Sequence, residues 1–202
     1  MRLGSNKQSG FTLLELMVVV AIAGIMAGLA MPFMGDQMAK QRINGDYKSI
    51  RGVMKTAKSG GATDKDFSSV IVCPGTESGC SGGNWEDGFI TFGDVDGSGG
   101  FTNGDQILAM QDKLSAGTTL TVTDENNASQ AVSLITLTQQ GYTADFLSTT
   151  APSYLFKYCN TGTDAATVVR GLVYGPGGII RMAVDTDENG IPNYGAADLT
   201  CP

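Results

Sequence analysis

The residues with the clearest potential for chemistry form an acidic, glycine-rich stretch from Asp94 to Asp105, which reads DVDGSGGFTNGD. Calcium loops place oxygen ligands at positions one, three, five, seven, nine and twelve, with a glycine at position six for the sharp turn. Gly99 stands at position six, and the ligand positions hold Asp94, Asp96, Ser98, Gly100, Thr102 and Asp105. The pattern predicts a calcium site, with an acidic turn as the alternative.

One departure from the pattern concerns position twelve, where the short Asp105 replaces the usual bidentate glutamate. The replacement should weaken calcium binding or shift the preference towards magnesium. The residues before the loop, FITF at 89–92, are typical of a strand, so the loop is expected on a β scaffold. A second acidic run, 185–190, lacks an acid at its twelfth position, and we interpret it as a hairpin turn.

A single acid, Glu15, interrupts an apolar segment near the N-terminus. A carboxylate placed this way costs about 2.5 to 3.5 kcal/mol on membrane-insertion scales, so it needs a partner or a function. No residue from Leu16 to Gly35 is ionisable, and a helix of that length spans about 30 Å, the thickness of a bilayer core. Residues 11–35 are therefore predicted to span a membrane, after a short leader, residues 1–10, that carries Arg2 and Lys7.

The four cysteines are even in number and follow a membrane export signal, which favours disulfides in an oxidising compartment. Three pairings are compatible with the count. We favour Cys73 with Cys80, across a short loop, and Cys159 with Cys201, which would tie the C-terminus to a strand. A metal site built from these cysteines, the alternative to disulfides, is disfavoured because the chain has no C-x-x-C pair and no histidine.

The elements that must position these residues change character along the chain. Apolar residues in the range 36–58 recur at helical spacing with basic residues on other faces, which predicts an amphipathic continuation of the membrane helix, ended by the glycines after Ser59. The rest, 59–202, is long enough for one compact head. Its β-rich runs lie at 70–73, 89–92, 119–123, 131–138, 154–159, 168–175 and 179–185, with a partly helical alternative for 131–138.

The formal net charge of −7 is unevenly distributed. From Asp66 onward the chain holds sixteen acidic residues and four basic ones, Lys113, Lys157, Arg170 and Arg181. Because nonspecific nucleic-acid binding rests on basic patches, DNA is an unlikely partner of this head. The absence of histidine removes the commonest general base, and no phosphate-binding or nucleophile-elbow motif is present, so no enzyme activity is expected.

The junction GFTLLE, from Gly10 to Glu15, resembles the processing site of type IV prepilins and type II secretion pseudopilins. The resemblance implies that a prepilin peptidase cuts after Gly10 and methylates the new N-terminal Phe11. It also implies that Glu15 neutralises the N-terminal ammonium of a neighbouring subunit during assembly, a pairing that is strong in hydrocarbon.

The head narrows the resemblance to minor pilins of the GspH, FimT and FimU group. The element W-x-x-G-F-x-x-F-x-D, from Trp85 to Asp94, is similar to theirs, and so is the C-terminal cysteine pair followed by Pro202. FimT-like proteins that take up DNA carry an arginine-rich G-R-x-R element, for which this chain has only Gly178-Ile-Ile-Arg181. The resemblance implies a pilin-like α+β fold, with a long N-terminal helix packed on a mainly antiparallel β head.

The resulting functional hypothesis is a FimU-like minor pilin that primes type IV pilus assembly within a tip complex. Its expected partners are other minor pilins, the major pilin, the prepilin peptidase and the inner membrane. The head would face the periplasm until the subunit enters a surface filament, and no cofactor is required beyond the candidate Ca²⁺. The alternatives are a GspH-like type II secretion pseudopilin, a FimT-like DNA-uptake pilin and a major pilin.

Overall fold

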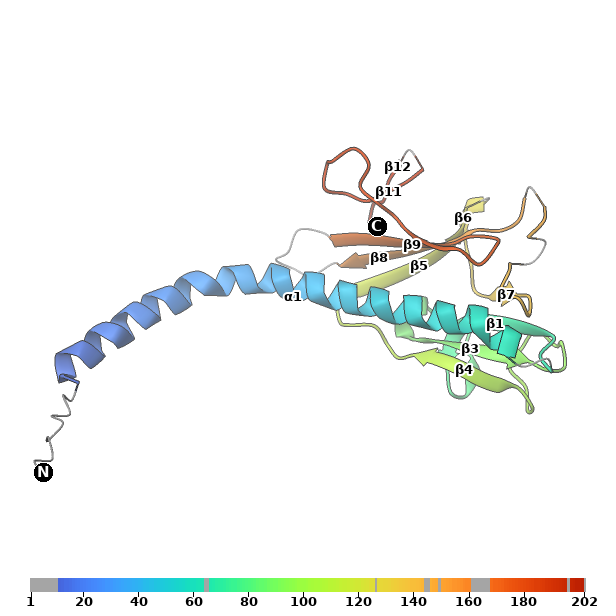
Figure 1. The fold of residues 1–202 in the computed structure, drawn as a ribbon, viewed down its shortest axis with the longest axis horizontal. Coiled ribbons are helices and arrows are strands. Elements are labelled where there is room, and N and C mark those ends of the chain that lie inside the picture. Colours follow the sequence, from blue (N-terminus) through green and yellow to red (C-terminus); the bar gives the residue numbers. More distant parts are fainter. Residues whose placement is uncertain are drawn as a thin grey trace, which may run out of the picture.

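The computed structural model describes residues 11–63, 66–125, 127–143, 146–148, 150–160, 168–195 and 197–201. One helix of 51 residues, α1, spans Leu13–Thr63, and the strands follow it in the chain. Figure 1 shows the C-terminal half of α1 running between two groups of strands, while the N-terminal half projects beyond them as a curved rod. The fold is α+β and pilin-like, with a long N-terminal helix on an antiparallel β head, as the sequence predicts.

Two five-stranded antiparallel sheets form the head (Figure 1). The first sheet comprises β1 (Ser69–Thr76), β2 (Gly79–Cys80), β3 (Phe89–Asp94), β4 (Gln106–Gln111) and β7 (Ile135–Leu137). Its order is β2-β1-β3-β4, and β7 pairs with the N-terminal part of β1, whereas β2 pairs with the C-terminal part. The second has the order β10-β9-β8-β5-β6, with β5 (Thr118–Asp124), β6 (Asn127–Ala131), β8 (Tyr154–Asn160), β9 (Val168–Tyr174) and β10 (Ile180–Met182). A short separate pair comprises β11 (Asn193–Tyr194) and β12 (Ala197–Asp198).

The C-terminal half of α1 supplies one side of the core. Ile43, Tyr47, Ile50, Met54 and Ala57 follow the three- and four-residue spacing of one helix face, and all five are buried. They join a single apolar cluster with residues of both sheets, and α1 contacts β1, β3 and β4 on one side and β8 and β9 on the other. The helix therefore holds the two sheets together.

The helix ends later than the sequence predicts. Its expected end lies at residue 58, before Ser59 and two glycines, yet α1 continues to Thr63. Packing explains the difference, because a Cβ at Gly60 would lie 2.4 Å from Leu108 and one at Gly61 would lie 2.6 Å from the backbone oxygen of Gln139. Only a residue without a Cβ fits so close to Leu108 and Gln139. The packing of this last turn therefore outweighs the low helix propensity of the two glycines.

The strands differ from prediction in several places, apart from the two-residue strands β2, β11 and β12, which were not predicted. The run 131–138 is divided between β6 and β7, which belong to different sheets, and no helix forms there. The run 179–185 yields only the short β10. Strand β4 was not predicted, because its side chains are exposed or half-buried and lack a clear alternation.

The element from Trp85 to Asp94 connects the two sheets. Trp85 lies in a short 3₁₀ helix, η1 (Trp85–Asp87), and its ring packs against Phe89 of β3 at 5.7 Å and Phe156 of β8 at 5.9 Å. The indole nitrogen donates a hydrogen bond to the carbonyl of Val132 at 2.6 Å. Gly88 has a φ of 117°, a conformation that disfavours any residue with a Cβ.

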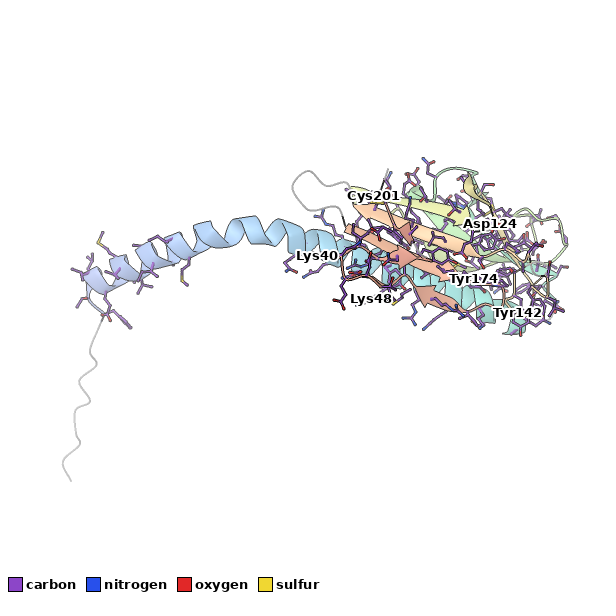
Figure 2. The ribbon with its side chains drawn as sticks, turned by 90° about the horizontal axis from the view of Figure 1, so that it is seen from above. Lys40, Lys48, Asp124, Tyr142, Tyr174 and Cys201 are labelled. Carbon is purple, nitrogen blue, oxygen red and sulfur yellow. A yellow bond between two sulfur atoms is a disulfide. The ribbon has the colours of Figure 1, made fainter. Side chains whose placement is uncertain are left out.

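Two disulfides close the head in the favoured pairing. Cys73 of β1 is bonded to Cys80 of β2, and Cys159 of β8 is bonded to Cys201 near the C-terminus. Cys159 packs with Val169 and Leu199 in a small apolar cluster on the second sheet. The second disulfide therefore holds the C-terminal hairpin, β11 and β12, against the sheet (Figures 1 and 2).

We expect the change Ile50→Ala to lower the free energy of unfolding by about 2 to 5 kcal/mol, because it removes a fully buried side chain between the sheets. Urea unfolding of the full chain in detergent measures the change. The matched control Ile179→Ala alters a side chain that is 53% exposed and should change stability by less than about 0.5 kcal/mol. Equal effects of the two changes would show that the helix does not carry the core.

The two disulfides should differ in their contribution to stability. Replacing Cys159 and Cys201 with serine opens a loop with a sequence separation of 42, and replacing Cys73 and Cys80 opens one with a separation of 7. The chain-entropy relation gives losses of about 4 and about 2.5 kcal/mol. Only the first variant should also become sensitive to protease near its C-terminus. A Cys73–Cys159 peptide in a non-reducing digest of the wild type would contradict the pairing.

Candidate functional site

The N-terminal end of α1 carries the predicted assembly residue. Thr12 precedes the helix, and its hydroxyl oxygen accepts a hydrogen bond from the backbone N–H of Glu15 at 3.2 Å, which is the geometry of a helix N-cap. Glu15 lies in the first turn, where the helix dipole favours an acid. Within the described residues no cation pairs with its carboxylate. Phe11 is 84% exposed, and Gly10 lies outside the described residues.

Apolar side chains cover the first turns of α1 without any partner from the head. The described side chains from Phe11 to Met26 are all exposed, and they include Leu13, Leu14, Leu16 and three consecutive valines. A helix that is apolar all round is normally buried in a core, a membrane or an assembly. The exposed half of α1 is therefore a surface that requires an apolar environment.

Among the helical residues that the structure describes, no stretch is both long and apolar enough to cross a membrane. The side chains of residue 27 and of residues 29–36 lie outside those described.

The acidic loop joins β3 to β4 and so sits on a β scaffold, although only the strand before it was predicted. Asp94 is the last residue of β3, Asp105 directly precedes β4, and Asp96 lies in the turn between them. One carboxylate oxygen from each of the three lies within 4.8 Å of the other two. Asp94 is buried and Asp96 is exposed, so the cluster runs from the sheet edge to solvent.

Backbone N–H groups of the loop itself hold these carboxylates in place. Asp94 accepts from Gly97 at 2.8 Å and from Gly99 at 3.0 Å, and Asp105 accepts from Val95 at 2.9 Å and from Thr102 at 2.7 Å. Glycines 97 and 99 have φ values of 72° and 77°, which the turn requires. The chain thus brings three acids together, and none of them forms an ion pair with a basic side chain of the described residues.

The remaining predicted ligands surround the same cluster. The Ser98 hydroxyl donates to the carbonyl of Gly100 at 3.0 Å, and the Thr102 hydroxyl is 3.1 Å from carboxylate oxygens of both Asp96 and Asp105. Hydrogen bonds from the Ser98 side chain and backbone lower the pKa of Asp96 below its ordinary value. Carboxylate, hydroxyl and carbonyl oxygens gathered in this way suit a hard cation with oxygen ligands.

The second acidic run forms the turn that its sequence indicates. An antiparallel bridge between Val184 and Asn193 closes it, and Asp185 accepts a hydrogen bond from the backbone of Gly190 at 2.7 Å. Asp198 of β12 joins this turn, which no local sequence pattern predicts. Its carboxylate accepts from Asn189 at 2.9 Å and from Asn193 at 2.6 Å, because the β11–β12 hairpin folds back over the loop.

The N-terminal part of the chain matches a known sequence motif. A family profile described as the prokaryotic N-terminal methylation motif matches residues 5–31. The fimbrial protein EcpB of Eikenella corrodens is 53% identical over 51 residues, which is 25% of this chain and 31% of that protein. A type IV major alpha-pilin of Moraxella bovis is 39% identical over 61 residues, 29% of this chain and 38% of its own length.

A fimbrial protein of Pseudomonas aeruginosa matches over a longer stretch, 33% identical over 92 residues, which is 46% of this chain and 55% of that protein. The chain thus spans about a third of the length of the first relatives. No solved structure matches the chain. The methylation motif and these relatives make the chain similar to type IV pilins in part of its length, and its fold, a long helix on a β head, is pilin-like.

Proposed function

We propose that the chain is a FimU-like minor pilin that primes type IV pilus assembly within a tip complex. The observation that carries the proposal is the difference in burial between the two halves of α1. One face of its C-terminal half is buried between the sheets, while the described apolar side chains of its first turns are all exposed. Residues 11–35 would lie first in the inner membrane and then among the helices of a filament, where van der Waals packing replaces contact with lipid.

Processing would prepare the helix end for this role. Prepilin peptidase would remove residues 1–10 and methylate Phe11, which would leave a charged N-terminus four residues before Glu15. In an apolar surrounding, the ammonium of one subunit and the Glu15 carboxylate of its neighbour would each be costly alone and favourable together. The pair would set the register in which a new subunit enters.

The head would serve as a contact surface in the periplasm, where its two disulfides are stable. We infer no enzyme activity, and the acidic balance of the head argues against DNA. Arg181 lies exposed on β10, whereas Arg170 is half-buried and donates to the carbonyl of Val169, so the two do not form a shared basic element. The fimbrial names of the relatives favour a pilus over a type II secretion pseudopilus.

The proposal is tested by using the full chain as bait for the other pilins encoded beside it, in detergent extracts of membranes. Stable recovery of minor pilins, with the chain present in sheared filaments at far lower abundance than the major pilin, is the expected result. Abundance equal to the major pilin would make it a major pilin. Recovery of secretion pseudopilins alone, with a secretion defect on deletion, would assign it to the type II system.

The variant Glu15→Val should still insert in the membrane and fail to enter filaments, because insertion needs the apolar run and register needs the charge. Glu15→Gln, which keeps the shape and loses the charge, should fail equally. Leu14→Val, an apolar change beside it, should enter normally. Immunoblots of membrane and sheared-filament fractions measure both steps. Normal entry of the glutamine variant would remove Glu15 from the mechanism.

We further propose that the loop of residues 94–105 binds Ca²⁺ through Asp94, Asp96, Ser98, Gly100, Thr102 and Asp105. The observation in favour is the approach of three carboxylates within 4.8 Å, none of which is paired with a cation in the part of the chain that the structure describes. The short Asp105 should keep the dissociation constant near about 10⁻⁴ to 10⁻³ M, as in extracellular modules. A cation would then relieve carboxylate repulsion and stabilise the head.

The melting temperature should therefore rise by a few degrees in about 10 mM Ca²⁺, since binding at that affinity stabilises by about 1.4 to 2.7 kcal/mol. Asp96→Ala should abolish the response and leave the metal-free head no less stable. Asp187→Ala, in the second acidic run, should keep the response. Melting curves of the wild type that are the same with calcium and with EDTA would return the loop to an ordinary acidic turn.

A further inference from the structure

The second sheet ends in a strand that is open on one side. Among the described residues, β10 pairs with β9 alone. Two backbone hydrogen bonds of 2.9 Å, one to the carbonyl of Ile179 and one from the N–H of Ala183, show which residues of this stretch face β9. Because alternate residues of an antiparallel strand bond to the same neighbour, Arg181 belongs to this series. The backbone groups of Ile180 and Met182 therefore point away from β9, and we call them the open edge.

The two residues of the open edge also share one face of the sheet. Ile180 packs against the cluster that contains the buried face of α1, so its side chain points to the helix side of the sheet. Met182, two residues further on, points to the same side and is 53% exposed. Directly opposite residues of paired strands share a face. A strand that bonded to the open edge would therefore place the side chains of its bonded residues towards α1.

Three cations of α1 lie on the side that faces the open edge. Lys58 lies beside the turn that leads into β10, because a Cβ at Gly178 would be 3.2 Å from its side chain. Arg51 and Lys55 precede Lys58 by seven and three residues, so they lie on the same side of the helix. All three cations are exposed, and we call them the basic flank.

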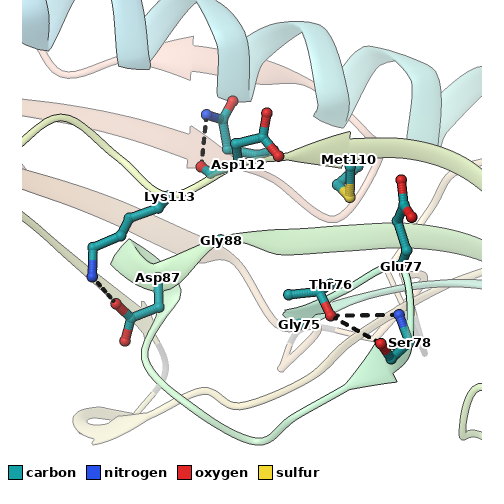
Figure 3. A pocket seen from close by; sticks show the side chains of 10 residues that line it. Gly75, Thr76, Glu77, Ser78, Asp87, Gly88, Met110, Asp112 and Lys113 are labelled. Atoms are coloured by element: carbon teal, nitrogen blue, oxygen red, sulfur yellow. Dashed lines mark hydrogen bonds and ion pairs between the residues drawn. The ribbon is translucent and has the colours of Figure 1, made fainter.

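In the described part of the chain the basic flank forms no ion pair. The one ion pair of that part joins Lys113 to Asp87 at 2.7 Å, and it borders a cavity of about 330 Å³ at the end of β4 (Figure 3). Strand β4 lies on the other side of α1, where Ser49 bonds to Gln111. Cations beside a strand edge repel a basic strand and attract an acidic one, so the basic flank selects the charge of whatever pairs with β10.

We propose that the open edge of β10 and the basic flank together bind an extended acidic segment of a different pilin. The segment would add an antiparallel strand to the second sheet, with the backbone of its acidic residues bonded to Ile180 and Met182 and their carboxylates towards the basic flank. The inference rests on the proposed assembly function and names the chemistry of the partner.

The two halves of this surface exclude other occupants. Unpaired N–H and C=O groups at strand spacing match another peptide backbone, which neither a lipid surface nor a nucleic acid supplies. The cations in turn distinguish an acidic strand from a basic one. A contact with a different pilin adds one neighbour and does not propagate along the filament, as a subunit of low abundance requires.

The test uses the full chain in detergent micelles, with a blocked peptide of alternating glutamate and valine as the acidic strand. Hydrogen–deuterium exchange is measured residue by residue. The amides of Ile180 and Met182 should exchange fast in the free chain, and saturating peptide should slow both by about tenfold or more, which corresponds to about 1.4 kcal/mol. Amides that are already slow in the free chain, or that the peptide leaves unchanged, would contradict the proposal.

Two N-methylated peptides give a matched control for backbone pairing. Methylation of the glutamate nitrogens removes the N–H groups that would face β10, so it should abolish the protection. Methylation of the valine nitrogens, which would face solvent, should preserve it. A peptide of alternating lysine and valine should give no protection. Equal effects of the two methylated peptides would overturn pairing at this edge.

Arg51→Glu should weaken peptide binding by about tenfold, because it reverses one charge of the basic flank. Arg42→Glu makes the same change nine residues earlier, on the opposite side of the helix, and should leave binding unchanged. Equal effects of the two variants would remove the basic flank from the contact.

Four further results separate the possible failures. Minor pilins recovered with the full chain should protect the amides of Ile180 and Met182, and fast exchange in that complex would overturn the contact while the proposed function stands. Protection by the peptide in a chain that never enters filaments would overturn the proposed function alone. Protection that rises with the concentration of the chain itself, without peptide, would replace the different pilin with a second copy. Retention on duplex DNA or anionic nanodiscs that Arg51→Glu loses, without protection by the peptide, would assign the basic flank to another class of partner.

Discussion

The structure depends on the burial of one face of α1 between two β-sheets. Ile43, Ile50 and Met54 are inaccessible to solvent, and each lies in the cluster that contains residues of both sheets. Neither sheet covers its inner face without the helix, because an apolar sheet face needs a second layer. The disulfides and the Trp85 contacts act on an arrangement that the helix already fixes.

The same packing places the two halves of α1 in different surroundings. Half of α1 is held by the head, and the described side chains of its first turns remain apolar and exposed. Under the proposed function, contacts made by the first turns in an apolar environment would set the placement of the head, which lies about 1.5 Å per residue further along the helix. Glu15 at the far end would set the register of a new subunit, and the head would complete its contacts outside the membrane.

Much of this arrangement follows from the sequence, and the exceptions have physical causes. The helical spacing of Ile43, Tyr47 and Ile50 predicts the buried face, and most strands follow from their β-branched and aromatic residues. The helix extends past its predicted end because tertiary contacts at Gly60 and Gly61 outweigh the low helix propensity of glycine. The split between β6 and β7 and the inclusion of Asp198 in the second acidic turn depend on tertiary contacts, which local pattern does not contain. The acidic loop was visible because its ligand spacing is a local property, and the structure gathers the acids as that spacing predicts.

The central claim is that this chain is processed as a pilin and assembles through the freed end of α1. The intact mass of the protein purified from membranes of its host tests that claim most directly. The account predicts a chain that begins at Phe11 with one added methyl group, retains the whole of α1 and has both disulfides closed. A mass that retains residues 1–10, or one that shows cleavage beyond the apolar half of the helix, would contradict it.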